Sequence, residues 1–297
     1  MIAIPGGTLL MGSTEFYSDE GPVHERDVAA FEIETRAVTN EEFADFVTAT
    51  GYVTVAERAL DPAEFPGADP ADLVPGSMVF TPTSGPVDLR DWRQWWRWQP
   101  GARWREPEGP GSSIDGRLDH PVVHVSFEDA SSYAAWAAKR LPTEAEWEWA
   151  ARGGLVGARF AWGDDAHPGG QLMANSWQGS FPYSNTGAQG WAGTSPVGTF
   201  RPNGYGLYDM TGNTWEWTTD YYQPRHSTPG AAAPDAGQRT NLLASASIEP
   251  GTATARRTLK GGSHLCSPEY CLRFRPAARS AQAEDTGMTH IGFRCAR

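Results

Sequence analysis

Two cysteines near the end of the chain are the residues best suited to carry chemistry. Cys266 and Cys271 lie in the segment 261–275 with four residues between them. In a straight strand their side chains would point to opposite faces, but the turn that Pro268 favours can bring both sulfurs to one point. Two converging thiolates are soft ligands, which favour Cu(I) over magnesium, calcium or manganese. A structural zinc site needs four ligands, and this segment supplies two thiols and at most His264.

The residues around the pair favour the thiolate form, but they do not exclude a purely structural role for the two cysteines. Arg273 and Arg275 bring positive charge near the thiols, which lowers thiol pKa values and favours the form that metal binding or redox chemistry requires. The chain has three cysteines, and an odd, small number in 297 residues does not make a disulfide framework. Spacing alone leaves a short structural disulfide, or two buried apolar thiols, open as alternatives for Cys266 and Cys271.

Three helices are predicted from their starting residues. Thr39–Glu42 is a capping box, followed by an apolar face of Phe43, Phe46 and Val47 and ended by Gly51. The other two helices carry the same kind of start signal. One begins at Ser126–Asp129, buries Tyr133, Ala134, Trp136 and Ala137 and runs to about Arg140; the other begins at Pro142–Glu146, buries Trp147 and Ala151 and ends at Gly153.

Elsewhere, short alternating runs between Gly and Pro predict strands of a few small sheets. Val28–Ile33 and His120–Val125 are the clearest of these runs, and Pro224–Gly237 is predicted to be a surface loop. The chain has 13 Trp, 12 Phe and 9 Tyr beside 33 Gly and 23 Pro, which indicates aromatic anchors under irregular backbone. We therefore expect one α+β domain over residues 1–297, compact and with little regular secondary structure.

Charge and hydropathy limit the partners. A formal net charge of -12 makes nucleic acid an improbable partner, because such binding relies on Lys and Arg. The basic and aromatic run Arg90–Trp98 is therefore assigned to cation–π packing, with cleft lining as a second use. No stretch approaches the roughly 18 apolar residues of a membrane span, and the start Met1–Gly7 lacks a signal-peptide pattern. We expect a cytoplasmic monomer that binds no membrane.

Several motifs make the sequence resemble the formylglycine-generating enzyme family, also called the sulfatase-modifying factor family. They run through most of the chain: Ile4–Gly7, Met11–Ser13, Val38–Asn40, His120–Ser126, Lys139–Glu148, Asn203–Asp209, Gly212–Trp217 and Gly292–Cys295. Most of them mark only the fold, which non-catalytic and lectin-like relatives share. The discriminating feature is Cys-x4-Cys after Gly-Gly-Ser, and it is intact here. The resemblance implies a C-type-lectin-like fold with the cysteine pair at the base of a surface cleft.

The resemblance also implies an activity. The pair would hold Cu(I), and the cysteine of an unfolded or nascent client, a type I sulfatase with a Cys-x-Pro-x-Arg context, would join as a third thiolate. With O2 and a thiol reductant, a hydrogen leaves the client Cβ, and the resulting thioaldehyde hydrolyses to Cα-formylglycine. By residue-to-residue matching, Ser263 and Trp215 line the site, and we expect Arg273 to orient the peptide or tune the thiolates. Departures from the family pattern bear on client preference: His264, Ser267–Glu269, Leu272 and Ala281–Thr286.

Two calcium sites follow from the same resemblance. The first would use Asp209 and Glu216 with the carbonyls of Gly212 and Thr214, and its alternative is a packing segment with a satisfied carboxylate. The second would use Asn175 and the carbonyls of Ser176 and Trp191, with Gln189 in place of the usual acidic member. Losing that negative charge weakens a site for a hard cation.

The remaining candidates are single residues. His120 and His124 are four apart, but Pro121 and two valines place them on a predicted strand, so we expect His124 in the core. His264 is near enough to the thiols to relay a proton. Cys295 is expected to be a buried free thiol, because Ala134 stands where some secreted relatives carry its disulfide partner.

Two other functions stay open. One is a lectin-like module that holds calcium without catalysis. The other is an iron-dependent sulfoxide synthase of the same fold group, although the His-rich helical domain that such enzymes carry has no counterpart in this sequence.

Overall fold

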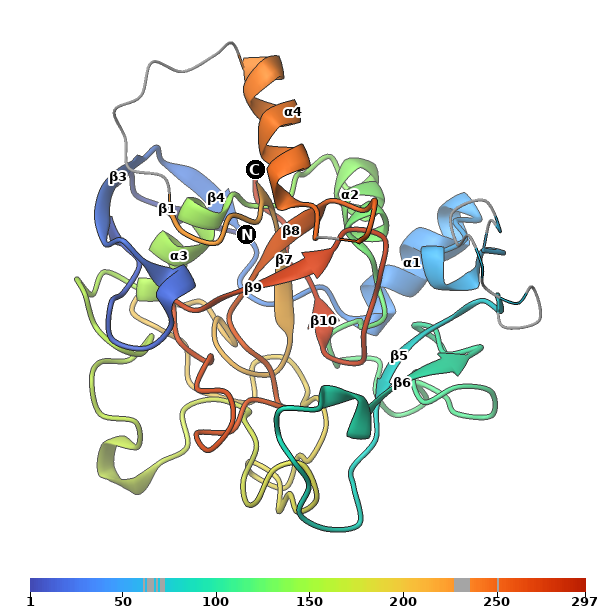
Figure 1. The fold of residues 1–297 in the computed structure, drawn as a ribbon. Helices are drawn as coiled ribbons and strands as arrows, with labels where there is room; N and C mark the ends of the chain where they lie inside the picture. Colours follow the sequence, from blue (N-terminus) through green and yellow to red (C-terminus); the bar gives the residue numbers. More distant parts are fainter. Residues whose placement is uncertain (61, 63–66, 68, 70–72, 227–235, 250) are drawn as a thin grey trace.

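The chain folds into several small sheets and few helices (Figure 1). The computed structural model describes residues 1–297 except 61, 63–66, 68, 70–72, 227–235 and 250. Three two-stranded antiparallel sheets, β1–β4, β2–β3 and β5–β6, accompany one four-stranded sheet. The strands of the pairs are β1 (Ile2–Ile4), β2 (Gly7–Met11), β3 (His24–Val28), β4 (Phe31–Ile33), β5 (Gly76–Phe80) and β6 (Trp96–Pro100).

The four-stranded sheet has the order β10-β7-β8-β9 and determines where the cysteines lie. β7 (Trp215–Tyr221) pairs in parallel with β10 (Ile291–Gly292) and antiparallel with β8 (Arg256–Lys260). β9 (Arg279–Ala283) closes the other side of β8. The segment carrying Cys266 and Cys271 is the connection between β8 and β9, so both of its ends are fixed by one antiparallel pairing.

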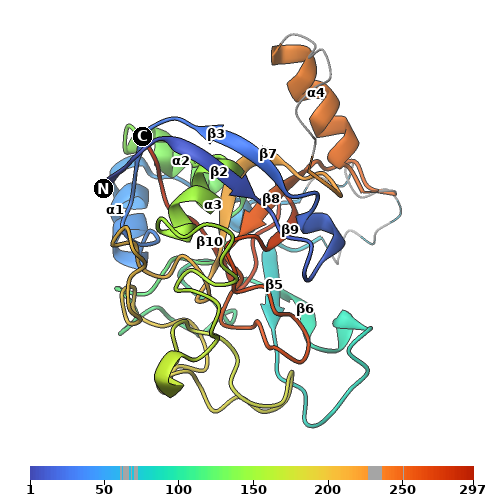
Figure 2. The same ribbon diagram turned by 90° about the vertical axis from the view of Figure 1, so that its left-hand side faces the viewer.

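The helices follow their predicted caps. α1 (Asn40–Thr50), α2 (Phe127–Trp136) and α3 (Glu144–Arg152) each begin after a complete capping box, at Thr39, Ser126 and Thr143. Gly51 and Gly153 end α1 and α3 in the left-handed conformation that glycine adopts without strain. A further helix, α4 (Ala236–Ser247), projects away from the rest of the fold (Figure 2). Short 3-10 turns lie at Ser18–Glu20, Val55–Glu57, Trp92–Gln94 and Pro168–Gly170.

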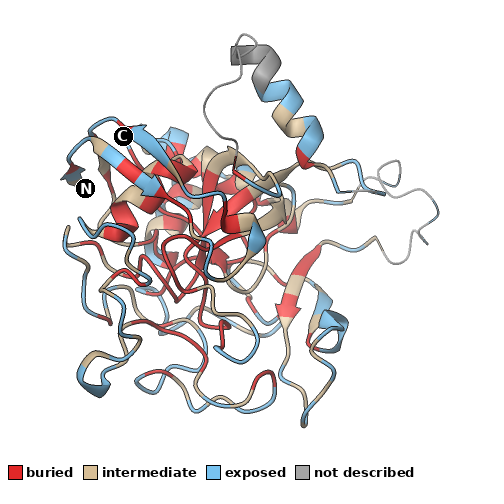
Figure 3. Cartoon of the chain, turned by 60° about the vertical axis from the view of Figure 1, so that its left-hand side comes forward, coloured by how far each residue is buried: buried red, intermediate tan, exposed pale blue. Residues whose placement is uncertain are grey.

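Burial is greatest around the four-stranded sheet and the helices against it (Figure 3). One apolar cluster joins α1, α2 and β7 with Cys266 and Cys295, through Phe43, Tyr133 and Trp217. A second cluster packs α3 against the N-terminal strands. A third consists of Trp95, Trp177, Phe181 and Leu265, which come from loops rather than from regular elements. Large aromatic side chains therefore organise the irregular half of the molecule.

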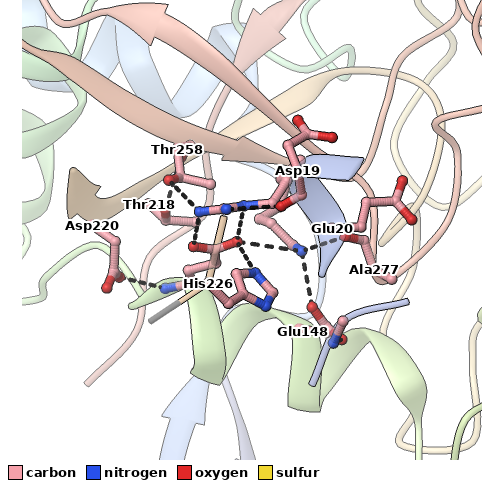
Figure 4. A network of polar contacts seen from close by, with 12 residues as sticks. Asp19, Glu20, Glu148, Thr218, Asp220, His226, Thr258 and Ala277 are labelled. Atoms are coloured by element: carbon pink, nitrogen blue, oxygen red, sulfur yellow. Dashed lines mark hydrogen bonds and ion pairs between the residues drawn. The ribbon is translucent and has the colours of Figure 1, made fainter. Parts of the chain in front are cut away.

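Buried charges join α3 to the sheet (Figure 4). Lys260 of β8 lies 3.0 Å from the Glu148 carboxylate, and Arg279 of β9 lies 2.7 Å from Glu144. All four side chains are buried. Because each charge has a close partner of opposite sign, the strong cost of burying it is offset.

The structure corrects several sequence expectations. The second helix ends at Trp136 rather than near Arg140, and Trp136 is 45% exposed. Val28–Ile33 is divided between β3 and β4 instead of forming one strand. His120–Val125 forms no strand, because His124 has a positive φ of 60° that breaks extended pairing. In the predicted loop Pro224–Gly237, residues 227–235 lie outside the described part, and α4 already begins at Ala236.

The expectations for His124 and Cys295 are confirmed. His124 is fully buried and its Nδ1 lies 2.8 Å from the Ser77 hydroxyl. Cys295 is a buried free thiol in the cluster that also contains Ala134. Among the described residues, no helix is both long and apolar enough to span a membrane.

Candidate active site at the paired thiols

The two cysteines of the β8–β9 connection face one another. Their Sγ atoms are 3.5 Å apart, and both cysteines are free thiols. A tight turn brings them together, because the amides of Tyr270 and Cys271 both donate to the Ser267 carbonyl, at 3.0 and 2.6 Å. The convergence predicted from the Ser-Pro turn is thus confirmed. Cys266 is buried, whereas Cys271 is partly exposed.

The pair shares its proton unequally. A hydrogen bond from the Cys271 thiol lowers the pKa of Cys266, and the Ser263 amide, 3.4 Å from its Sγ, and the Arg273 guanidinium lower it further. The same hydrogen bond, with burial and the nearby Cys266 charge, raises the pKa of Cys271. The pair therefore loses its first proton more easily than an ordinary cysteine and its second proton less easily.

Arg273 is held beside the thiols by residues from the N-terminal part of the chain. Its guanidinium stacks over the Tyr17 ring at 4.3 Å and lies 3.8 Å from the Asp19 carboxylate. It also donates to the Arg279 carbonyl at the start of β9. The Tyr17 hydroxyl accepts from the Leu272 amide at 3.1 Å. The loop Tyr17–Asp19 thus fixes both the charge and the backbone next to Cys271.

Ser263 and Trp215 lie in the same neighbourhood. The Ser263 hydroxyl accepts from the Leu265 amide at 3.2 Å and lies 3.3 Å from Nδ1 of His290. Trp215 shares the apolar cluster of Cys266, and its amide donates to the His290 carbonyl at 2.8 Å. His290 thus links two residues that the sequence placed at the site.

His264 is held within the protein by a backbone contact. Its Nδ1 is 2.8 Å from the Asn213 carbonyl, and the side chain is buried. Burial lowers the pKa of His264 to about 4, so the ring is neutral near pH 7. A proton relay through this residue stays a prediction.

An aromatic wall stands next to Cys271. Tyr270, 39% exposed, stacks on Phe181 at 4.7 Å between ring centroids, and Trp95 meets both rings edge-on at 5.5 and 5.4 Å. Trp95 comes from the basic and aromatic run, which also shows Arg93 over Trp92 at 4.8 Å. The cation–π packing predicted for that run is therefore present, and cleft lining by the run stays a prediction.

The first predicted calcium site holds an ion pair. Arg294 donates to both carboxylate oxygens of Glu216, at 2.7 and 2.8 Å, and the Trp147 indole donates to one of them at 2.7 Å. Asp209 accepts from the Gly198 amide at 2.7 Å, and burial raises its pKa to about 6. With both oxygens of Glu216 engaged, the geometry favours the packing alternative over calcium with Gly212 and Thr214. Calcium here stays a prediction.

The second predicted calcium site retains an unused acceptor. Asn175 is 1% exposed, and its Oδ1 has no hydrogen-bond partner, while its Nδ2 donates to the Gly193 carbonyl at 2.9 Å. The carbonyls of Ser176 and Trp191 each accept one hydrogen bond, which leaves each a second lone pair. Gln189 is exposed nearby at a φ of 51°. A buried amide oxygen without a partner fits a bound cation.

Comparison with known proteins identifies the family. The model of the sulfatase-modifying factor enzyme 1-like domain matches residues 1–297. The chain is 60% identical over 295 residues to the formylglycine-generating enzyme of Mycobacterium tuberculosis, covering 99% of this chain and 96% of that protein. This chain belongs to the sulfatase-modifying factor family. Within the family it is also 38% identical to mouse inactive C-alpha-formylglycine-generating enzyme 2, over 100% of this chain and 85% of that protein.

The α+β fold agrees with a solved structure of the same type. PvdO from Pseudomonas aeruginosa matches with a TM-score of 0.62 at 23% identity, covering 99% of this chain and 92% of that chain. At this identity the likeness concerns the fold alone. For this member of the sulfatase-modifying factor family, activity must therefore be argued from the site.

Sequence reasoning missed the residues that support the thiols from a distance. Tyr17, Asp19 and His290 are separated from Cys266 by long stretches of chain, and their types are common on protein surfaces. The charge of Arg273 was the available signal for Asp19, because a cation that is largely removed from water needs an acidic partner. His290 gave no signal, because its role comes only from the pairing of β10 with β7.

Proposed function

We propose that this chain is an oxidoreductase that converts a cysteine of a sulfatase-type client protein into Cα-formylglycine. Relatives named formylglycine-generating enzyme, aligned over nearly the whole chain, support the reaction class. A relative named inactive aligns over the whole chain as well, so overall similarity does not decide activity. The observation that carries the proposal is the pair of free thiols 3.5 Å apart, one of them partly exposed.

In this proposal Cys266 and Cys271 hold Cu(I). Two converging sulfurs suit a soft monovalent ion, and the described residues contain no group of three or more His, Cys, Asp or Glu side chains arranged for a metal. The client thiolate would supply the missing ligand. Bound copper would provide the centre at which the client sulfur is held and O2 is activated.

The protein's own groups prepare that centre. Arg273 and the Ser263 amide favour the thiolate at Cys266, and Asp19 holds Arg273 in place. The ring of Tyr270 and its aromatic neighbours shield one side of Cys271 from water. An extended client segment with a Cys-x-Pro-x-Arg context would approach from the exposed side of Cys271.

The reaction needs an electron source besides the client. Converting the thiol-bearing methylene of a cysteine to an aldehyde releases two electrons and the sulfur as hydrogen sulfide, whereas reducing O2 to water takes four electrons. A thiol reductant would supply the other two electrons together with two protons. Turnover should therefore require both O2 and reductant.

Calcium is proposed at the second site. Asn175 Oδ1 and the carbonyls of Ser176 and Trp191 would be ligands, with Gln189 as a neutral neighbour. Such an ion would brace the loop that follows Trp177 without taking part in the redox chemistry.

A peptide assay tests the reaction. The copper-loaded full chain is incubated with a Cys-x-Pro-x-Arg peptide, O2 and a thiol reductant, and mass spectrometry follows loss of sulfur with gain of a carbonyl. We expect conversion by the native chain and by Cys295→Ala, a control that removes a buried thiol outside the pair. Cys266→Ala and Cys271→Ala should abolish it. Unchanged peptide with the native chain would refute the function, and activity in either pair variant would refute the role of the thiols.

A further inference from the structure

A cavity of about 530 Å³ lies beside the thiol segment. Aromatic and aliphatic side chains form much of its wall, chiefly Val79, Phe80, Trp177, Tyr183, Trp191 and Leu265. Two of these aromatics are exposed at its edge, Tyr183 at 36% and Trp191 at 37%. A concave apolar site with exposed aromatics at its rim is typical of a binding pocket.

The cavity adjoins the candidate active site. His264 and Leu265, which line it, immediately precede Cys266 in the chain. The Trp177 amide, in its wall, donates to the Cys266 carbonyl at 3.0 Å. From Trp177 the aromatic wall leads to Phe181 at 5.1 Å and on to Tyr270, next to Cys271, at 4.7 Å. The two centroid separations together correspond to about three extended residues at roughly 3.3 Å each.

The charges of the lining define what the cavity can accept. Glu108 and Arg117 lie 2.9 Å apart and neutralise each other. Nδ1 of His120 lies 2.9 Å from the Thr194 hydroxyl, and Nδ1 of His264 is engaged by the Asn213 carbonyl. No other Asp, Glu, Lys or Arg is among its described lining residues. A charged side chain would lose its hydration here without gaining a partner, whereas an apolar one gains by burial.

We propose that this cavity is a specificity pocket for the client, and that it binds an uncharged aromatic or large aliphatic side chain about three residues from the target cysteine. The inference rests on the proposed function and adds a preference outside the cysteine, proline and arginine positions of the client. The apolar wall supplies the binding energy, and the path along Tyr270 and Phe181 sets the distance from the reacting sulfur.

Peptide series on the native chain test the preference. In a Cys-x-Pro-x-Arg peptide, the third residue before and the third after the cysteine are each changed from Ala to Trp, Leu, Glu or Lys. We expect Trp and Leu at one of these positions to raise kcat/KM roughly tenfold over Ala, and Glu and Lys to give no gain. Equal rates for all residues at both positions, or a preference for a charged residue, would overturn the proposal.

Filling the cavity with a larger side chain tests whether the client preference arises there. Ala192→Trp places a large ring in the cavity, and the matched control Ala135→Trp places one on the exposed surface of α2. We expect Ala192→Trp to lose the gain that Trp and Leu give over Ala, while Ala135→Trp keeps it. Retention of the gain in a folded Ala192→Trp chain would show that the preference arises elsewhere.

Affinity measurements with unreactive peptides test the pocket independently of the proposed function. Peptides with Ser in place of the target Cys cannot react, and calorimetry measures their affinity for the native chain. A Trp-over-Ala affinity preference that Ala192→Trp removes supports the pocket even if no peptide is converted. Conversion without that preference supports the function and rejects the pocket.

Discussion

At the scale of single residues, two buried thiols of this chain have opposite surroundings. Cys266 receives hydrogen bonds from the Cys271 thiol and the Ser263 amide and lies near Arg273, so its pKa is lowered. Cys295 is buried, and Glu34 lies close to it, so its pKa is raised. Burial alone does not make a cysteine inert or reactive; the charge and the donors that share its space do.

The contribution of Arg273 can be measured by removing its charge. Arg273→Met keeps much of the side-chain volume but withdraws the guanidinium that favours the Cys266 thiolate. We expect the pH profile of alkylation of the pair by iodoacetamide, in metal-free protein, to move to higher pH, and peptide conversion to fall at least tenfold. Cys295→Ala in the same background removes labelling at the third thiol. An unchanged alkylation profile would show that Arg273 does not tune the pair.

Gln189 offers a second residue-scale test, on calcium. Gln189→Asp returns a negative charge to the loop beside Asn175, and hard cations bind more tightly as ligand charge increases. We expect calcium to raise the unfolding temperature of Gln189→Asp more than that of the native chain; tenfold tighter binding adds about 1.4 kcal/mol at saturation. Asn175→Ala should remove the response. A calcium response that persists in Asn175→Ala would place the ion elsewhere.

At the scale of elements, local signals in the sequence were sufficient for the starts of α1, α2 and α3 and for the thiol turn, but α4 was not predicted. Capping boxes at Thr39, Ser126 and Thr143 act within four residues, so they can be read directly from the chain. The turn at Ser267 is equally local, and it made the meeting of the two sulfurs predictable. These features depend on neighbours in sequence and not on the rest of the fold.

Features that depend on distant neighbours were not predictable in the same way. His120–Val125 alternates like a strand, but the His124 amide donates to the Met288 carbonyl and its backbone turns to a positive φ. Trp136, the last residue of α2, packs against Phe46 of α1 at 5.5 Å between ring centroids, yet it stays 45% exposed. The cavity beside Cys266 combines several separate segments, so no single stretch reveals it.

The buried ion pairs between β8 and α3 allow another test. Lys260 has no exposed surface, and its Nζ lies 3.0 Å from Glu148 and 3.7 Å from Glu144. Lys260→Met leaves two buried carboxylates with less positive charge, and we expect a loss of about 3–5 kcal/mol in the free energy of unfolding by urea. Arg36→Met, at a partly exposed ion pair with Glu42, should cost less than about 1 kcal/mol. Similar losses in the two variants would contradict the role given to burial.

At the scale of the whole molecule, buried titratable groups couple folding to pH in separate ranges. Burial lowers the pKa of His124 to about 4, below its value of 6.5 in the unfolded chain. The contribution of His124 to the free energy of unfolding is therefore complete above pH 6.5 and is lost as the pH falls from 6.5 to 4. Charge partners lower the pKa of Glu144 and Glu148 despite the opposing effect of burial, so their contributions are lost at still lower pH, below about 4.5. Asp209 has the opposite effect, because burial raises its pKa to about 6. Its contribution to the free energy of unfolding therefore declines as the pH rises toward 6.

Because these effects overlap, the role of one group is measured as the difference in unfolding free energy between the native chain and a variant that lacks the group. His124→Asn removes the titrating ring, and Asn tolerates the left-handed backbone that His124 adopts. We expect the native chain to gain stability over His124→Asn as the pH rises from 4 to 6.5, by on the order of 3 kcal/mol, with no further gain above pH 7. Urea unfolding of both chains at intervals across this range measures the difference. A constant difference would mean that His124 keeps an ordinary pKa in the folded chain.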